Sequence, residues 1–278
     1  MKSEMYACLS FMLIATMQAT APATKSGLAI LERVQSARKS IIYAATVETI
    51  TLQPRPRAVT AHVYHKSGKE RIEYSFQGIT TLILIDDGER IYRLHPHARI
   101  AYVRASLCKE LNAKLLHRNY KIHLLEDEVV AKRKCFVLSI QPKYAGNPSR
   151  KMWIDKATYV MLRNETYDGA GALVAMTVYR NIVYDINLDD ELFKVPKGWR
   201  TVNDSSVILR ELNRSKIESI VGFPLKLPRF IPQGYHLDSV EILRCCHGMP
   251  IVHMRYTDGL NCLSVFEHLS CTPKRWWR

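Results

Sequence analysis

Most of the chain alternates apolar and polar residues with a period of two, which is the pattern of β-strands with one buried face. Between residues 70 and 77, for example, Ile72, Tyr74 and Phe76 alternate with charged or polar side chains. Turn residues such as Ser67-Gly68 and Asp86-Asp87-Gly88 separate successive runs. The pattern predicts an antiparallel meander of about six strands, at Tyr43–Leu52, Ala58–Lys66, Glu70–Gln77, Ile79–Ile85, Arg90–Leu94 and Arg99–Arg104.

Two segments in the first half of the chain follow the helical period instead. Ser26 is placed to cap a helix that runs to about Lys39, and Ser106–His117 collects leucines on one side. Strands then resume and continue to residue 184, with Asp168-Gly169 as the turn between the last two. We expect these strands at Tyr120–Leu125, Cys135–Gln141, Met152–Asp155, Val160–Tyr167 and Ala172–Tyr184.

The last third of the chain has its own organisation. Residues 201–206 are polar and lack a period, so we expect a linker there, followed by a helix at Val207–Val221. Prolines at 224, 228 and 232 and a glycine at 234 then exclude regular structure. Three further runs predict a small antiparallel meander, at Leu237–Arg244, Pro250–Tyr256 and Leu260–Leu269.

The N-terminal segment and the net charge indicate that the protein is exported and binds an anionic partner. Residues 1–23 combine Lys2, an apolar run from Met5 to Met17 and small residues near Ala21, as a signal peptide does. The formal net charge of +14 over 278 residues indicates an anionic partner, such as membrane headgroups or an acidic protein surface. No concentrated helix or aromatic platform supports a nucleic-acid partner. The basic, aromatic tail Lys274–Arg278 suits either a membrane interface or a solubilising role.

Six cysteines remain after the expected signal peptide: Cys108, Cys135, Cys245, Cys246, Cys262 and Cys271. The last four lie close together in the small meander, so we expect at least one disulfide there in an oxidising compartment. The pairing stays open. Metal binding is disfavoured because no CxxC spacing is present.

The sequence lacks the motifs of the common enzyme classes. It has no GxSxG, HExxH, Walker loop or GxGxxG motif. His95 and His97 form an HxH pair, but Pro96 lies between them and no third ligand is evident. We therefore expect a binding protein that is not an enzyme and that uses no cofactor or metal.

The amino-acid sequence of the last meander is more informative than its strand pattern. Leu227-Pro228 and Pro232-Gln233-Gly234-Tyr235 precede a strand, and Met254–Leu260 (MRYTDGL) then leads into Leu263–Glu267 (LSVFE). This combination resembles the C-terminal domain of the MucB/RseB family, extracytoplasmic regulators of envelope-stress sigma factors.

A second, independent resemblance covers the first domain. Met152-Trp153-Ile154-Asp155, a strand with Leu162-Arg163, an Asp-Gly turn and Leu192-Phe193 before Pro196 are similar to the closing half of the LolA/LolB-like fold. MucB/RseB proteins combine such a domain with a small C-terminal one, so the two resemblances predict each other. They imply an α+β protein with a half-open, curved antiparallel barrel at residues 24–200 and a small sheet-plus-helix domain at residues 207–278.

The resemblance implies a periplasmic regulator that binds the extracytoplasmic part of an anti-sigma factor and senses lipid or misassembled envelope components. The alternative is a lipid or lipoprotein carrier of the LolA type, and a third possibility is an exported scaffold without a ligand. In the regulator and the carrier, acyl chains would contact apolar residues that alternation assigns to one concave face. These residues are Val59, Val63, Ile72, Tyr74, Phe76, Trp153 and Met176. The small domain would supply partner contacts at Tyr235, Arg255, Tyr256, Asp258 and Phe266.

Overall fold

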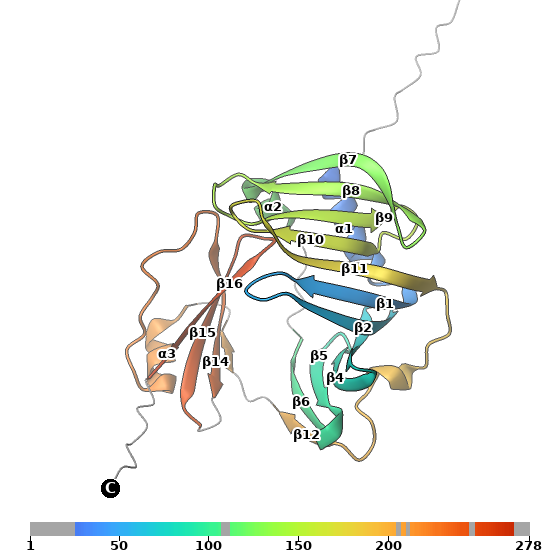
Figure 1. Cartoon of the computed structure of the whole chain (residues 1–278). Coiled ribbons are helices and arrows are strands. Elements are labelled where there is room, and N and C mark those ends of the chain that lie inside the picture. The colour runs from blue at the N-terminus through green and yellow to red at the C-terminus, as the bar shows by residue number, and fades with distance from the viewer. Residues whose placement is uncertain (1–25, 107–111, 204–206, 210–211, 245–247, 270–278) are drawn as a thin grey trace, which may run out of the picture.

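A computed structural model describes residues 26–106, 112–203, 207–209, 212–244 and 248–269. The expected signal peptide and the tail at 274–278 lie outside the described residues. The described part forms a long curved sheet and a separate small sheet (Figure 1). No helix in these ranges is long and apolar enough to cross a membrane.

The large sheet has twelve strands in the order β12-β6-β5-β4-β3-β2-β1-β11-β10-β9-β8-β7. Neighbouring strands pair antiparallel, except for β12 and β6, which pair in parallel. The linear order leaves the sheet open, as expected for a half-open barrel. Its strands are β1 (Ile42–Thr51), β2 (Arg57–Lys66), β3 (Lys69–Phe76), β4 (Ile79–Asp86), β5 (Arg90–His95), β6 (Ile100–Ala105), β7 (Tyr120–Val130), β8 (Arg133–Pro142), β9 (Ser149–Asp155), β10 (Met161–Tyr167), β11 (Leu173–Tyr184) and β12 (Arg200–Asn203).

Two helices cover one end of the concave side of this sheet. In α1 (Gly27–Ala37) the Ser26 hydroxyl accepts the backbone N–H of Ala29 at 3.2 Å, which confirms the expected cap. Gly27 lets the helix approach β7, because a Cβ there would lie 2.4 Å from Ile122 Cγ2. With α2 (Ala113–Asn119), α1 buries a core on β7 to β9 that contains Ile30, Leu31, Leu116, Leu138, Ile140 and Ile154.

The opposite side of β4 to β6 is covered by the segment that follows β11. A short 3-10 helix, η2 (Asp190–Phe193), places Phe193 beside Ile85 and Leu94, and all three side chains are buried. A second 3-10 turn, η1 (Pro96–Ala98), joins β5 to β6. Helices α1 and α2 bury their main core on β7 to β9, and the C-terminal end of α1 also borders β1 to β3.

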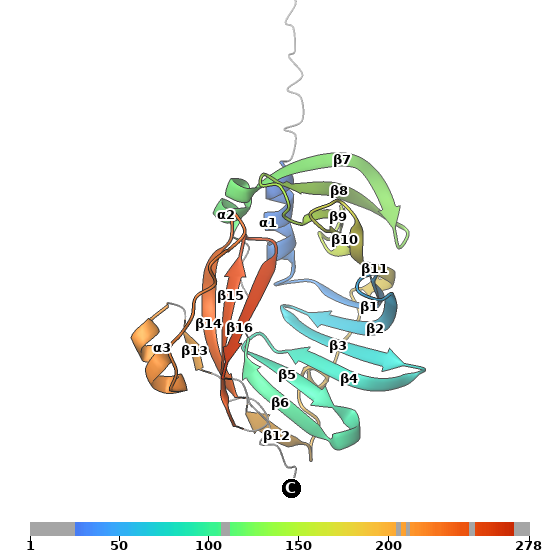
Figure 2. The same cartoon turned by 60° about the vertical axis from the view of Figure 1, so that its left-hand side comes forward.

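The small sheet has four strands in the order β13-β14-β15-β16. They are β13 (Val207–Leu209), β14 (His236–Arg244), β15 (Pro250–Thr257) and β16 (Cys262–His268). Helix α3 (Arg214–Val221) packs on one face and forms a core with Val240, Val252 and Met254. Figure 2 shows α3 on the far side of this sheet, while the large sheet curves around its other side.

Two expected elements at the junction differ from the structure. Residues 200–203 form strand β12, which pairs with β6, so the large sheet reaches into the expected linker 201–206. Residues 207–209 pair with β14 as a strand, and the helix expected from Val207 begins only after Asn213, whose side chain caps it. The expected helix Ser106–His117 is represented by α2, with residues 107–111 outside the described ranges.

Candidate functional site

The concave face of β2 to β4 is apolar and accessible. Strand pairing places Val63 opposite Ile72 and Ala61 opposite Tyr74, so the expected residues of β2 and β3 share one face. Exposure increases toward one end of these strands, from 4% for Val63 to 40% for Val59 and 66% for Phe76. Ile79, paired with Phe76, is 58% exposed. Apolar side chains with this much exposure on one face mark an interaction surface.

Strand pairing places Trp153 and Met176 in rows on the other side of the sheet from Val59, although Trp153 and Val63 are buried in the same hydrophobic core. Met176 pairs with Ile50, which pairs with Ala58, the immediate neighbour of Val59 on its strand. Successive residues of a strand point to opposite faces, so Met176 lies on the other side. The row of Trp153 runs, by the same pairing, through Arg163, Val178, Glu48 and Thr60. The buried Trp153 indole donates to Glu128 at 2.8 Å and packs beneath Lys151 and Arg163.

A pocket of about 160 Å³ lies on the concave side where α1 meets β1 to β3. Its polar part is built around His65, which is 1% exposed and stacks on Tyr43 with ring centroids 5.1 Å apart. His65 Nε2 lies 2.8 Å from the Arg38 carbonyl oxygen, and Nδ1 lies 3.7 Å from Glu70 Oε2. The remaining lining includes Val34, Ala37, Ile41, Tyr159, Val160, Met161 and Tyr179.

Burial and neighbouring charges set the protonation states of the tyrosines and of Glu70 in this pocket. Burial raises the pKa of Tyr43 well above its usual value and raises the pKa of Tyr179 to about 12, so both phenols stay neutral. Burial alone would raise the pKa of Glu70, but the nearby His65 ring and the Arg38 charge together hold that pKa below its usual value. The pocket therefore combines a carboxylate, a guanidinium and neutral phenols, without a nucleophile and base in mutual contact.

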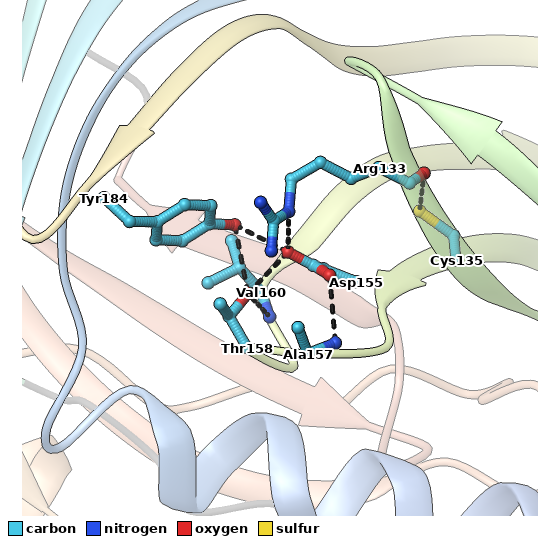
Figure 3. A network of polar contacts seen from close by, with 7 residues as sticks. All are labelled: Arg133, Cys135, Asp155, Ala157, Thr158, Val160 and Tyr184. Carbon is cyan, nitrogen blue, oxygen red and sulfur yellow. Dashed lines mark hydrogen bonds and ion pairs between the residues drawn. The ribbon is translucent and has the colours of Figure 1, made fainter.

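A second polar network joins the ends of β9 and β11 beside the pocket (Figure 3). The Asp155 carboxylate, 2% exposed, accepts hydrogen bonds from Arg133, Thr158, Tyr184 and the backbone N–H of Ala157. Burial opposes its charge, but the Ala157, Thr158 and Arg133 donors lower the pKa of Asp155 below its usual value. All acceptor capacity of this carboxylate is used inside one domain, which fits a structural role.

The small sheet presents a free face on the side away from α3. His253 stacks on Phe266 with centroids 4.3 Å apart, while its Nδ1 lies 3.5 Å from Glu241 Oε2. Arg255 Nε lies 3.0 Å from Asp238 Oδ2, and Phe266 is 56% exposed. Arg255 and Phe266, two of the expected partner residues, therefore lie on a face that a partner can reach.

The other three expected partner residues are not on this free face. Tyr256 is 8% exposed and belongs to the core beneath α3, and Tyr235 packs against the same core. Asp258 is fully buried against the large domain. In this conformation these side chains hold the small domain together or attach it, so a partner cannot contact Asp258 directly.

Asp258 belongs to a polar interface between the two domains. Asn119 donates to the backbone oxygens of Gly234 and Asp258, at 2.9 and 2.8 Å. Asn147 donates to the Gln233 carbonyl at 2.9 Å. Gly234 has a φ of +92° and could not carry a Cβ, which would lie 2.9 Å from the Tyr144 ring. The segments around Gly234 and Asp258 stand out in the sequence, but their role in joining the domains does not. The residues that contact them lie more than 80 positions away in the chain.

Comparison with solved structures clarifies the fold. The MucA/MucB complex of Pseudomonas aeruginosa matches with a TM-score of 0.63, over 86% of this chain and 79% of that chain, at 16% identity. A structure of MucB matches with a TM-score of 0.60, over 88% of this chain and 81% of that chain, also at 16% identity. The chain has the MucB fold.

Other comparisons are less informative. A family of uncharacterized proteins matches residues 108–183, and no curated protein matches the sequence. A LolA superfamily protein from Nitrosomonas europaea aligns with 62% of this chain at a TM-score of 0.31 and 14% identity. The MucB matches cover 86% and 88% of this chain, so the likeness in fold is not limited to the large sheet.

The described cysteines are reduced. Cys135 is buried and Cys262 is exposed, and both are free thiols. Burial raises the pKa of Cys135 to about 11, so its thiol is inert at neutral pH. The expected disulfide of the C-terminal region stays a prediction, because Cys108, Cys245, Cys246 and Cys271 lie outside the described residues.

Proposed function

We propose that this chain is an exported, non-enzymatic regulator that binds the extracytoplasmic segment of an anti-sigma factor. The supporting observation is the fold likeness to MucB across both domains, because MucB has been solved in complex with MucA(peri). The net charge of +14 favours an acidic segment as the partner. In this proposal the protein acts in the periplasm, after removal of residues 1–23.

We further propose that the concave face of β2 to β4 takes acyl chains or apolar partner side chains. Val59, Phe76 and Ile79 expose apolar surface there, and the pocket beside α1 offers a further 160 Å³. Occupation of this face by lipid would lower the affinity for the anti-sigma segment, which requires a reciprocal coupling between the two ligands.

The same apolar face favours a LolA-type lipid or lipoprotein carrier as the second candidate. The two candidates differ in what the small domain does. A carrier needs only the large domain to hold its cargo, whereas a regulator needs the small domain to hold its partner.

A capture experiment tests the proposal. The tagged mature chain is incubated with detergent-solubilised envelope, and bound protein and lipid are identified by mass spectrometry. We expect a single-span anti-sigma factor that is displaced when soluble lipid is added. Recovery of many lipoproteins by the large domain alone would instead support the carrier.

Substitution of the concave face makes this test specific. Phe76→Ser removes an apolar side chain that is 66% exposed and should weaken capture about tenfold, equivalent to about 1.4 kcal/mol of binding free energy. Val129→Ser is the matched control, because Val129 on the edge strand β7 is also 66% exposed. Equal loss in both variants would show that general surface hydrophobicity, and not this face, retains the ligand.

A further inference from the structure

The junction between the domains contains a chain of hydrogen bonds that crosses the boundary at every step. Arg150 of the large domain donates from Nε and Nη2 to Asn261 Oδ1 of the small domain, at 3.2 and 3.1 Å. The Asn261 amide donates to the Tyr120 hydroxyl at 2.8 Å, and this hydroxyl donates to the Asp258 carboxylate. We call these four residues the domain latch.

Three of the four residues of the domain latch are buried, and Arg150 is half-buried. Tyr120 is 3% exposed, Asn261 is 8% exposed and Asp258 is fully buried. Burial and the nearby Asp258 raise the pKa of Tyr120 above its usual value, so its hydroxyl keeps the proton that it donates. Successive donors and acceptors polarise one another in such a chain, and a buried group that loses its partner is costly.

The backbone beside the domain latch is shaped for close contact. The turn Asp258-Gly259 has its Asp258 Oδ1 bonded to the N–H groups of Leu260 and Asn261, at 2.9 and 2.7 Å. A Cβ on Gly259 would lie 3.1 Å from Leu115 Cγ, so the turn fits against α2. Leu260 then packs against the core that α1 and α2 form on the large sheet. One turn thus supplies both the polar and the apolar parts of the joint.

The position of this joint determines what the small sheet faces. It attaches the end of β15 and β16 near α2, with α3 turned outward (Figure 2). The free face with Phe266 and Arg255 is then directed to the concave side of the large sheet, where Phe76 and Val59 are exposed. Strand β12 pairs with β6, so it fixes the segment that leads into the small domain to the large sheet. It does not fix the orientation of the small sheet itself.

We propose that the domain latch orients the small domain, so that its free face and the concave face of β2 to β4 form one composite binding surface for an acyl chain. Its four residues are positioning residues for the ligand and do not contact it. The ligand part of this inference rests on the proposed function, whereas the orientation part does not.

The test uses Tyr120→Phe and Asp258→Asn in the full mature chain. Tyr120→Phe keeps the buried ring and removes only the hydroxyl, which deletes the two bonds that join Tyr120 to Asn261 and Asp258 of the small domain. Tyr167→Phe is the matched control, because the Tyr167 hydroxyl donates to Glu165 at 2.5 Å within a single strand of the large sheet.

Three measurements separate orientation from ligand binding. X-ray scattering should give a broader distance distribution for both latch variants, and calorimetry should resolve two unfolding transitions where the native chain and Tyr167→Phe give one. The fluorescent acyl probe 11-(dansylamino)undecanoic acid should bind about tenfold more weakly to the latch variants than to the control.

A native distance distribution and a single transition in Tyr120→Phe and Asp258→Asn would overturn the inference. Altered scattering with unchanged probe affinity would overturn the positioning role while leaving the joint itself established. If the native chain fails to bind the probe, the proposed acyl site and the composite surface both fall. The scattering and calorimetry still decide whether the domain latch fixes the small domain relative to the large one.

Discussion

Asp155 shows how one residue secures the curvature of the large sheet. Its carboxylate accepts hydrogen bonds from β8, from the turn after β9 and from β11, which lies two strands away from β9 in the sheet. The sequence placed Asp155 at the end of a strand in a motif similar to the LolA/LolB-like fold. Its partners could not be predicted, because alternation gives the face of a residue but not the distant side chains on that face.

Asp155→Asn should lower the free energy of unfolding at pH 7 by about 2–3 kcal/mol, since it removes the charge that Arg133 and the other donors stabilise. The folded-state pKa of Asp155 is depressed, so its stabilisation is present above the unfolded pKa of about 4 and is lost as the pH falls below it. The deficit of the variant should therefore shrink as the pH falls from about 5 to about 3.

Urea unfolding at several pH values measures this difference. Asp127→Asn is the control, because Asp127 and Lys156 form an ion pair whose side chains are 49% and 34% exposed. Exposed pairs of this kind contribute less than about 1 kcal/mol. A deficit for Asp155→Asn that stays constant down to the lowest pH would contradict the assigned charge.

At the scale of elements, the strands with clear alternation were predicted and the short ones were not. Strands β2 and β3 lie within one residue of their predicted positions, because one face of each is apolar and the other polar. Strand β12 has only four residues, RTVN, and exists through parallel pairing with β6, about 100 positions earlier. Residues 207–209 are an apolar run of three, too short for periodicity to separate a strand from a helix.

Alternation gives the common face of residues on neighbouring strands but does not carry that assignment across the whole sheet. Val59 to Phe76 lie on strands joined by a short turn, so alternation carries their common face from one to the next. Trp153 and Met176 are reached only through long-range pairings, and register shifts interrupt β1 with β11 and β9 with β10. Each such shift changes the face of every later residue, and nothing in the local pattern marks it.

Helix α3 should be the main source of stability for the small sheet. Ile217 is fully buried in the core with Val252 and Met254, so Ile217→Ala should cost about 3 kcal/mol, within the 2–5 kcal/mol range for such truncations. Ile220 on the same helix is 37% exposed, so Ile220→Ala should cost less than about 1 kcal/mol. Hydrogen exchange of the β15 backbone amides measures the difference in stability between the two variants. Similar protection in the two variants would mean that α3 does not stabilise this sheet.

The whole molecule combines a large positive charge with an apolar concave face, and these two features should act at different stages of binding. The net charge of +14 attracts anionic surfaces over a Debye length of about 10 Å at 0.1 M salt, before any close contact forms. The apolar surface of Phe76 and Val59 contributes only after contact, through burial that salt does not screen. The sequence predicted both features, but it could not show that the joint at Asp258 determines which surfaces face each other.

Binding of the mature chain to lipid vesicles can separate these contributions. Vesicles with phosphatidylglycerol should bind at low salt and release the protein as the salt approaches about 1 M, where the Debye length is about 3 Å. Neutral phosphatidylcholine vesicles should bind weakly throughout. Phe76→Ser should leave the salt-dependent attachment unchanged, because it removes no charge, while it weakens capture of the acyl probe, because it removes apolar contact area. If Phe76→Ser instead abolishes attachment to anionic vesicles, the concave face inserts into the bilayer, and charge attraction and ligand binding are not separate steps.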